Sequence, residues 1–348
     1  MTRRQTQLPK ALLFMALCGC SSTAENTPVE GTDAGTQQAT DAGTEQRVVG
    51  AVFAEDTFEV DVTEDVVFAQ GLTHSDWRTS DGTPMDLLLD VYRPVRTEAP
   101  KMPVVVFIHG GSFMGGSHKK PEFVRMATSF ASRGWVAFSI DYRVAPHFGT
   151  VPANYPEVPE GADERQGNQW HALYPACRDA KAAIRWIRSK ADEYSMNTDY
   201  ITAIGGSAGS FIALALGVTN EEDCVNELSE VEDPTLAGTH REHASSIRTI
   251  IDHWGGTSIV RALEAMTPGA RFDANDPPIS IVHGTLDPTV PFSEAEAIKA
   301  EYDRTGAPYA WHPLDGRRHG PWDALVDGKN LTELAYDFIV EQQGLVVD

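Results

Sequence analysis

One serine of the chain stands in a setting that suits a nucleophile. Residues 205–209 read Gly-Gly-Ser-Ala-Gly, the only G-x-S-x-G of the 348 residues, with a strand-like run before them and a helical pattern after them. A serine raised on such a sharp turn needs very small residues two positions before and after it, which Gly205 and Gly209 supply. The amides at the start of the following helix favour negative charge beside Ser207. We predict that Ser207 is a nucleophile, with a solvated serine in a glycine-rich turn as the alternative.

A serine hydroxyl is inert until a base takes its proton, so the hypothesis requires a base and an acid that orients it. Asp287 follows one strand-like run and His319 follows the next. We predict that His319 is the general base and that Asp287 orients its ring. Together with Ser207 these residues would form a catalytic triad.

Other acids and histidines compete for these roles. Asp252 ends an earlier strand-like run and is the alternative acid, whereas Asp315, four residues before His319, is expected to shape the histidine loop. His283 and His312 lie in or beside strands, where a packed histidine is more common than a base.

A second glycine-rich loop follows the buried run at 104–108. Residues 109–117 read His-Gly-Gly-Ser-Phe-Met-Gly-Gly-Ser, and such glycines let backbone amides face an oxyanion. We predict that the amides of Gly111, Ser112 and Ala208 form an oxyanion hole. The rival, a phosphate loop, is disfavoured because the run lacks both the Walker ending and the G-x-G-x-x-G spacing. His109 is expected to brace the loop.

The apolar pattern predicts the scaffold that must position these groups. Strand-length apolar runs lie at 85–92, 104–108, 135–140, 200–204, 247–251, 279–282 and, most weakly, 309–312. Helical spacing of apolar residues occurs at 177–193, 207–218, 293–305 and 331–342. Apolar strands alternating with helices indicate an α/β fold with a mostly parallel central sheet and helices on both faces, in three layers. Reactive groups in such a sheet lie on loops beyond the carboxyl ends of the strands.

The pocket walls are less well defined by the sequence. Phe113, Trp254 and Trp322 lie beside the expected site loops, and each either binds substrate or packs in the core. The proline-rich segment 145–175 and the acidic segment 219–243 are long enough to cap the pocket, or they are solvated insertions.

The first residues have the features of an export signal. Basic residues precede an apolar stretch at 11–17, which is too short for a spanning helix of about 20 residues. We predict a lipoprotein signal peptide over 1–19. Residues 17–20 resemble a bacterial lipobox, which predicts a lipid on Cys20 and an anchor at the cell envelope; plain secretion is the alternative.

The composition beyond the signal separates a tether from a folded domain. Residues 20–46 are mostly Ser, Thr, Ala, Gly and acid, which cannot bury enough apolar area to offset the entropy of ordering, so we expect a flexible acidic tether. The expected hydrolytic groups all fall within 47–348, which we assign to one α/β domain. The net charge of -22 disfavours nucleic acid and leaves the lipid anchor as the expected membrane contact.

Two cysteines, Cys177 and Cys224, remain after the signal region. Export would place them in an oxidising compartment. Sequence alone leaves open whether they form a disulfide or remain two buried thiols.

Taken together, the motifs resemble the esterase/lipase branch of the α/β-hydrolases from about residue 60 to the end. The resemblance rests on His109-Gly110-Gly111, Asp141-Tyr142-Arg143, Gly205-x-Ser207-x-Gly209, Asp287 and His319. The chain is similar to the carboxylesterase, hormone-sensitive-lipase-like and bacterial feruloyl/acetyl-xylan esterase groups, whose helix before the nucleophile strand resembles 179–187. Ser112 departs from the lipase motif, which often has a third glycine there.

This resemblance implies hydrolysis of carboxylic esters through an acyl-enzyme, without a metal or an organic cofactor. The expected substrate is a small-molecule or polymer-linked ester. Two rival classes are a serine peptidase of the prolyl-oligopeptidase type and a catalytically silent binding lipoprotein. The first usually carries a large propeller, which the roughly 60 residues between tether and first buried strand cannot build.

Overall fold

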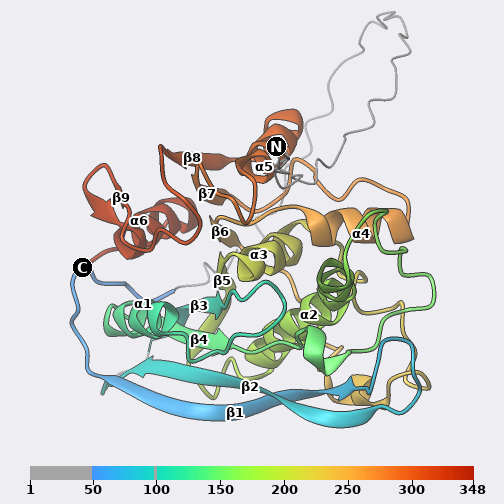
Figure 1. Cartoon of the computed structure of the whole chain (residues 1–348). Helices are drawn as coiled ribbons and strands as arrows, with labels where there is room; N and C mark the ends of the chain where they lie inside the picture. Colours follow the sequence, from blue (N-terminus) through green and yellow to red (C-terminus); the bar gives the residue numbers. More distant parts are fainter. Residues whose placement is uncertain (1–48, 98–99) are drawn as a thin grey trace, which may run out of the picture. The chain divides into compact units, whose positions relative to one another are not determined.

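The computed structural model describes residues 49–97 and 100–348 (Figure 1). The expected signal peptide at 1–19, the lipidation site Cys20 and the tether at 20–46 lie outside the described residues. Within the described ranges, no helix has both the length and the apolar character needed to cross a membrane.

The core of the fold is an eight-stranded sheet in the order β1-β2-β4-β3-β5-β6-β7-β8. Its strands are β1 Val60–Thr73, β2 Thr83–Pro94, β3 Met102–Ile108, β4 Val136–Ile140, β5 Met196–Gly206, β6 Thr249–His253, β7 Ile279–Gly284 and β8 Tyr309–Leu314. β1 pairs antiparallel with β2, and β2 pairs antiparallel with β4. Every later pairing is parallel, so the carboxyl ends of these strands meet at one edge.

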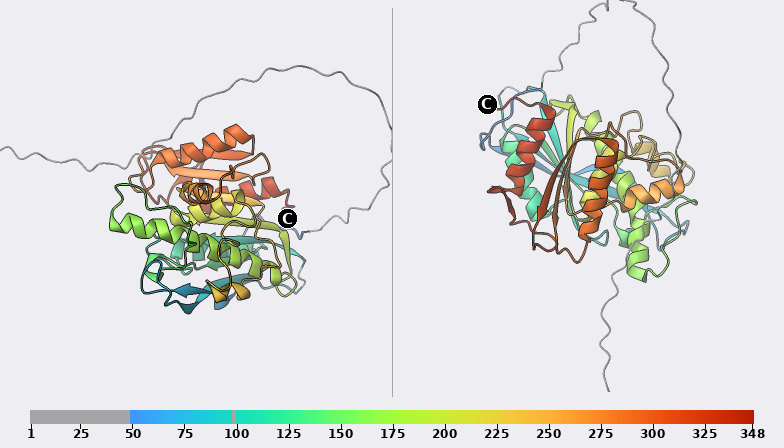
Figure 2. Two further views of the ribbon diagram at one scale, coloured as in Figure 1. Left: turned by 90° about the vertical axis from the view of Figure 1, so that its right-hand side faces the viewer. Right: turned by 90° about the horizontal axis from the view of Figure 1, so that it is seen from above.

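Helices cover both faces of the sheet (Figures 1 and 2). They are α1 Pro121–Ser132, α2 Glu164–Ser189, α3 Ala208–Val218, α4 Ser258–Met266, α5 Phe292–Thr305 and α6 Leu331–Gln343. Short 3-10 turns lie at Ala145–His147 and Pro234–Gly238, and a small hairpin joins β9 Leu325–Val326 to β10 Lys329–Asn330.

The side chains of β3 show how the layers form. Val104, Val106 and Ile108 pack in one apolar cluster with α2, α3 and α5. The alternating residues Val105 and Phe107 pack in a second cluster with α1 and α6. Alternate side chains of a strand point to opposite faces, so a continuous apolar run produces a sheet buried on both sides. The predicted three-layer α/β fold is confirmed.

Helix α2 begins earlier than the predicted start at 177. Asp163 caps it by accepting a hydrogen bond from the amide of Gln166 at 2.8 Å, and the Gln166 side chain accepts one from the amide of Asp163 at 2.9 Å. Pro175 lies inside the helix, where it removes one backbone donor. The capping box and the long buried face of α2 offset that loss, so more than a third of the segment 145–175 belongs to α2 rather than to a loop.

The acidic segment 219–243 packs against the helices through buried ion pairs. Asp233 accepts a hydrogen bond from Arg178 of α2 at 2.6 Å, and Asp223 contacts Arg271 at 2.7 Å. The acidic side chains therefore hold the segment onto the fold rather than leaving it solvated throughout.

Candidate active site

Ser207 stands on a sharp turn between β5 and α3. Its backbone has a φ of 56° and a ψ of -123°, and its amide donates to the carbonyl of His253 on the neighbouring strand at 2.9 Å. A Cβ on Gly205 would overlap the carbonyl of Gly209, and one on Gly209 would overlap the carbonyl of Ile108. The turn therefore requires both glycines of the motif, and it holds Ser207 in a backbone conformation that a serine rarely adopts.

The structure brings Ser207, His319 and Asp287 together. The Ser207 hydroxyl lies 2.9 Å from Nε2 of His319, and Nδ1 of the same ring lies 2.6 Å from Oδ2 of Asp287. Asp287 follows β7 and His319 follows β8, so adjacent parallel strands deliver both to the edge where β5 ends. A hydroxyl, an imidazole and a carboxylate in series can move a proton from the serine to the ring.

Asp287 is held in its ionised form by donors. Burial alone would raise its pKa, but hydrogen bonds from His283 and His319 together with two backbone amides hold that pKa well below its usual range. The amides belong to Thr289, at 2.8 Å, and Val290, at 3.0 Å, and both donate to Oδ1. Oδ2 is thereby left to accept from His319.

The competing acid, Asp252, makes no contact with His319 among the described residues. Its carboxyl is buried and accepts a hydrogen bond from the amide of Gly255 at 2.7 Å. Burial raises its pKa to about 6. Asp315 lies beside Thr285, with 3.4 Å between the two side chains, at the start of the histidine loop.

The competing histidines lie away from the serine. His283 is buried in β7, with Nε2 2.9 Å from the carbonyl oxygen of Val290 and 3.4 Å from Asp287. His312 lies partly buried in β8. The ring that contacts Ser207 is that of His319.

Three backbone amides around the serine have no partner in the described part of the chain. They belong to Gly111, Ser112 and Ala208, the predicted oxyanion hole. The Ser112 carbonyl is held by the side chain of Gln169, which donates to it at 2.9 Å from the first turns of α2. Helix α2 therefore reaches the oxyanion loop from one side.

Aromatic and charged side chains hold the loop that carries Gly111 in place. The Tyr142 hydroxyl donates to the carbonyl of His109 at 2.7 Å, and the two rings stack with centroids 4.3 Å apart. His109 Nε2 lies 3.3 Å from Asp141. In the same motif, Arg143 makes a buried ion pair with Asp179 at 2.6 Å.

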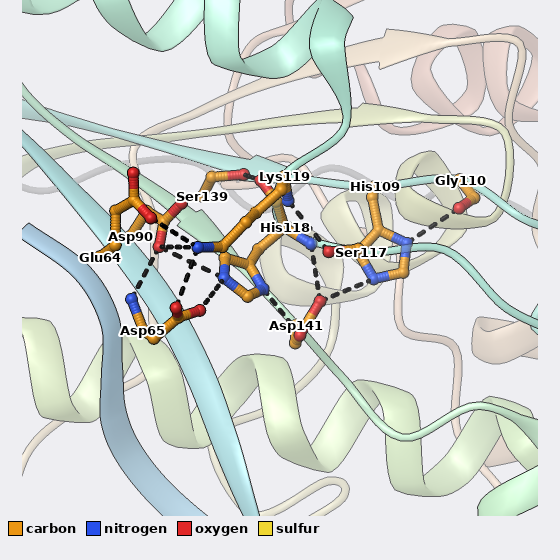
Figure 3. Close-up of polar contacts among 10 residues, drawn as sticks. All are labelled: Glu64, Asp65, Asp90, His109, Gly110, Ser117, His118, Lys119, Ser139 and Asp141. Atoms are coloured by element: carbon orange, nitrogen blue, oxygen red, sulfur yellow. Dashed lines mark hydrogen bonds and ion pairs between the residues drawn. The ribbon is translucent and has the colours of Figure 1, made fainter. Parts of the chain in front are cut away.

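A buried histidine joins this loop to the edge of the sheet (Figure 3). His118 Nδ1 lies 2.7 Å from Asp141, and Nε2 lies 3.1 Å from Asp65 and 3.2 Å from Asp90. Because carboxylates face both ring nitrogens, these contacts favour the ring with a proton on each nitrogen, in which both nitrogens donate. Burial alone would lower the pKa of His118, but the hydrogen bond and charge of Asp141, with Asp90 and Asp65, raise it.

A cavity of about 220 Å³ opens beside the serine. It is lined by Gly111, Ser112, Lys120, Gly206, Ser207, Trp254, Thr289, His319, Gly320 and Trp322. The rings of Trp254 and Trp322 pack edge to face, with their centroids 4.8 Å apart, and form one wall of the cavity. None of the residues that line this cavity belongs to the segments 145–175 or 219–243.

Phe113, the third expected wall residue, does not line the cavity. Its side chain is 6% exposed and packs edge to face against Tyr142 and Phe211. Phe113 has a φ of 56°, which turns the side chain back into the core. Of the two alternatives that the sequence leaves open for Phe113, the structure shows the packed one.

Cys177 and Cys224 are both buried free thiols. They lie side by side, and burial together with the neighbouring Cys177 thiol raises the pKa of Cys224. Of the two alternatives left open by the sequence, the structure shows the unbridged one.

Sequence reasoning missed several residues of the site. Lys120 and Thr289 line the cavity, and Asp65, Asp90 and His118 support the oxyanion loop. Asp90 could have been found, because it interrupts the apolar run at 87–92 within β2. Neither Asp65 nor Lys120 carries such a signal.

Comparisons with known proteins support this picture. The BD-FAE family model matches residues 89–158 and 166–270. Esterase LipC of Mycobacterium tuberculosis is 27% identical over 264 residues, 67% of this chain and 59% of that protein. Esterase LipQ of the same organism is 23% identical over 274 residues, 72% of this chain and 58% of that protein. The chain thus spans somewhat less than three fifths of the length of these curated relatives.

Solved structures show the same fold. Esterase Est2 of Thermogutta terrifontis with bound propionate has a TM-score of 0.56 at 24% identity, covering 83% of this chain and 95% of that one. Its native form has a TM-score of 0.54 at 26% identity, covering 83% and 93%. Because the family model matches half of the chain and the fold agrees, the protein belongs to the BD-FAE family, in the esterase/lipase group of α/β-hydrolases.

Proposed function

We propose that the protein is a serine carboxylesterase. The observation that carries the proposal is the series of hydrogen bonds from Ser207 through His319 to Asp287, at 2.9 and 2.6 Å, on a strained turn beside unpaired amides. Each group occupies the position that acyl transfer requires. The esterase relatives and the fold shared with Est2 support the same reaction.

In the first half of the proposed reaction, Ser207 Oγ attacks the ester carbonyl carbon while its proton passes to Nε2 of His319. The carbonyl oxygen becomes an oxyanion, which the amides of Gly111, Ser112 and Ala208 are placed to bind. The loss of one such donor typically costs about 10²–10³ in rate. When the tetrahedral intermediate collapses, the ester C–O bond breaks and the alcohol leaves with the proton from His319.

In the second half, water attacks the acyl-enzyme. His319 takes a proton from the water and returns it to Ser207 Oγ as the carboxylic acid departs. Asp287 keeps Nδ1 protonated throughout and stabilises the imidazolium that forms in both halves. The net reaction is ester plus water to acid plus alcohol.

The cavity favours small esters. Its volume of about 220 Å³ is below the roughly 300–1,000 Å³ that is usual for sites that hold drug-sized ligands. Est2 has been solved with propionate and with butyrate bound. We therefore propose that short acyl groups are preferred, whether the alcohol is a small molecule or part of a polymer.

We also propose that the enzyme is exported and lipid-anchored at the cell envelope. This proposal rests on the sequence of residues 1–19 and on Cys20. The lipid would hold the enzyme at the membrane. The acidic residues in 20–46 and the negative net charge would keep the folded domain away from anionic headgroups.

The function is tested with p-nitrophenyl butyrate and the Ser207→Ala variant. We expect the wild-type protein to hydrolyse the ester and the variant to lose at least about 10⁴-fold in kcat, with an unchanged melting temperature. Turnover retained by a folded Ser207→Ala protein would refute the proposal. Cleavage of a p-nitroanilide peptide in place of the ester would indicate a peptidase.

A further inference from the structure

Two adjacent lysines before α1 have opposite surroundings. Lys119 contacts Glu64 at 2.8 Å and Asp65 at 2.9 Å, so its charge is compensated (Figure 3). Lys120 lines the cavity that contains Ser207 and His319. Among the described residues, Lys120 has no ion-pair partner.

The cavity offers this ammonium group no carboxylate on its walls. Its lining is Gly, Ser, Thr, Trp and His apart from Lys120, while Asp287 lies behind the ring of His319 and is bound by it at 2.6 Å. The chain as a whole has a net charge of -22. The Lys120 ammonium is therefore a positive charge without a carboxylate partner in the site of a protein whose net charge is strongly negative.

The lysine also has a defined place on the cavity wall. Its Nζ lies 5.9 Å from the centre of the Trp322 ring, within the range of a cation–π contact. The ring of Trp254 packs nearly perpendicular to the same indole, with the two ring centroids 4.8 Å apart. An ester that lies against this indole wall from Ser207 would have Lys120 beside it.

We propose that Lys120 forms a subsite for a carboxylate, so that the preferred substrates are esters carrying a second, negatively charged carboxylate group. This inference rests on the proposed esterase function and names its substrate class. A lysine acts as a single point charge, which suits one carboxylate. Phosphate sites commonly add an arginine fork or a phosphate-binding loop, and no arginine lines this cavity.

The carboxylate could belong to the acyl group or to the alcohol, and matched ester pairs separate the two. The acyl pair is p-nitrophenyl hydrogen succinate and its neutral methyl ester. The alcohol pair is 4-carboxyphenyl butyrate and its neutral methyl ester. For each pair, the measured quantity is the ratio of kcat/KM for the anionic ester to that for the neutral ester.

We expect one pair to show a ratio that falls about tenfold in Lys120→Met and further in Lys120→Glu, because the first change removes the charge that attracts the carboxylate and the second reverses it. The matched control, Lys119→Met, should keep the wild-type ratio because its ammonium faces Glu64 and Asp65. In the wild-type enzyme, the same ratio should fall as NaCl rises from 50 to 500 mM, because salt screens the attraction.

Two failures are distinguishable. In the first, the wild-type enzyme turns over the neutral esters but neither ratio responds to substitution of Lys120. If the variants do not fold, the salt dependence of the wild-type ratios takes the place of this test. A lack of response refutes the carboxylate subsite and leaves the esterase function standing. If the wild-type enzyme hydrolyses none of the four esters, the proposed function fails first. A fall in the acyl-pair ratio places the carboxylate on the acid side, and a fall in the alcohol-pair ratio places it on the leaving group.

Discussion

Replacement of His118 by glutamine tests the support of the oxyanion loop. The side chains of His118 and Asp90 are 4% and 3% exposed, so the change leaves a buried carboxylate without its ring partner. Removal of one member of a buried ion pair typically costs about 3–5 kcal/mol. Lys119, 4.0 Å from Asp90, and the half-exposed Asp65 reduce this cost, so we expect a loss of about 2–3 kcal/mol. That loss corresponds to roughly 4 °C in melting temperature for a folded domain of this size.

The loss should depend on pH in a defined direction. Burial alone would lower the pKa of His118, but Asp141, Asp90 and Asp65 raise it in the folded state. A histidine with a raised folded pKa contributes stability that is fully present below its unfolded value of about 6.5. That contribution is lost as pH rises through the folded pKa. The difference between wild type and His118→Gln should therefore be largest below about pH 6 and shrink at alkaline pH.

Thermal unfolding of both proteins from pH 5 to pH 9 measures this difference. His243→Gln is the matched control, because the His243 side chain is 37% exposed and lies 3.8 Å from the exposed Glu242. The stability of this variant should follow that of wild type at every pH. A difference for His118→Gln that stays constant across the range would mean that the buried ring is neutral. The description of His118 as a charged link between loop and sheet edge would then be wrong.

Further substitutions examine the triad, the turn and the anchor. Asp287→Asn should lower kcat by about 10⁴-fold because the ring tautomer is no longer held, whereas Asp252→Asn should keep activity within about tenfold; the reverse ranking would assign the acid to Asp252. Gly209→Ala should lower the melting temperature or prevent folding, because its Cβ would overlap the Ile108 carbonyl, and a stable variant would contradict the described turn. Cys20→Ser should release the protein from the membrane fraction of the producing cell, and unchanged fractionation would refute lipidation.

The triad was predictable because its signals are local. The glycines around Ser207 mark the turn, and Asp287 and His319 each follow a strand whose apolar run is visible in the sequence. A parallel sheet brings the ends of such strands to one edge. The positions of the three residues after their strands are therefore enough to predict that they meet.

The supporting and binding residues were not predictable in the same way. Asp65 and His118 lie 53 positions apart, and they meet only because the antiparallel pair β1–β2 joins β4 at the edge of the sheet. Lys119 and Lys120 are identical in type and adjacent, and only the three-dimensional turn before α1 sends one to acids and the other to the cavity. The two alternatives for Phe113 stayed open for the same reason, since the position of a residue in the sequence of the loop does not say which way its side chain points.

The central claim, that Ser207 is a nucleophile activated by His319, is tested most directly by covalent labelling. Esterase Est2 has been solved phosphorylated by paraoxon, so paraoxon is the probe. Intact-mass and peptide analysis of the treated wild-type protein should show one diethylphosphoryl group, carried by Ser207, while His319→Ala should label far more slowly and Ser207→Ala not at all. A folded wild-type protein that remains unlabelled, or that carries the group on another residue, would contradict the account.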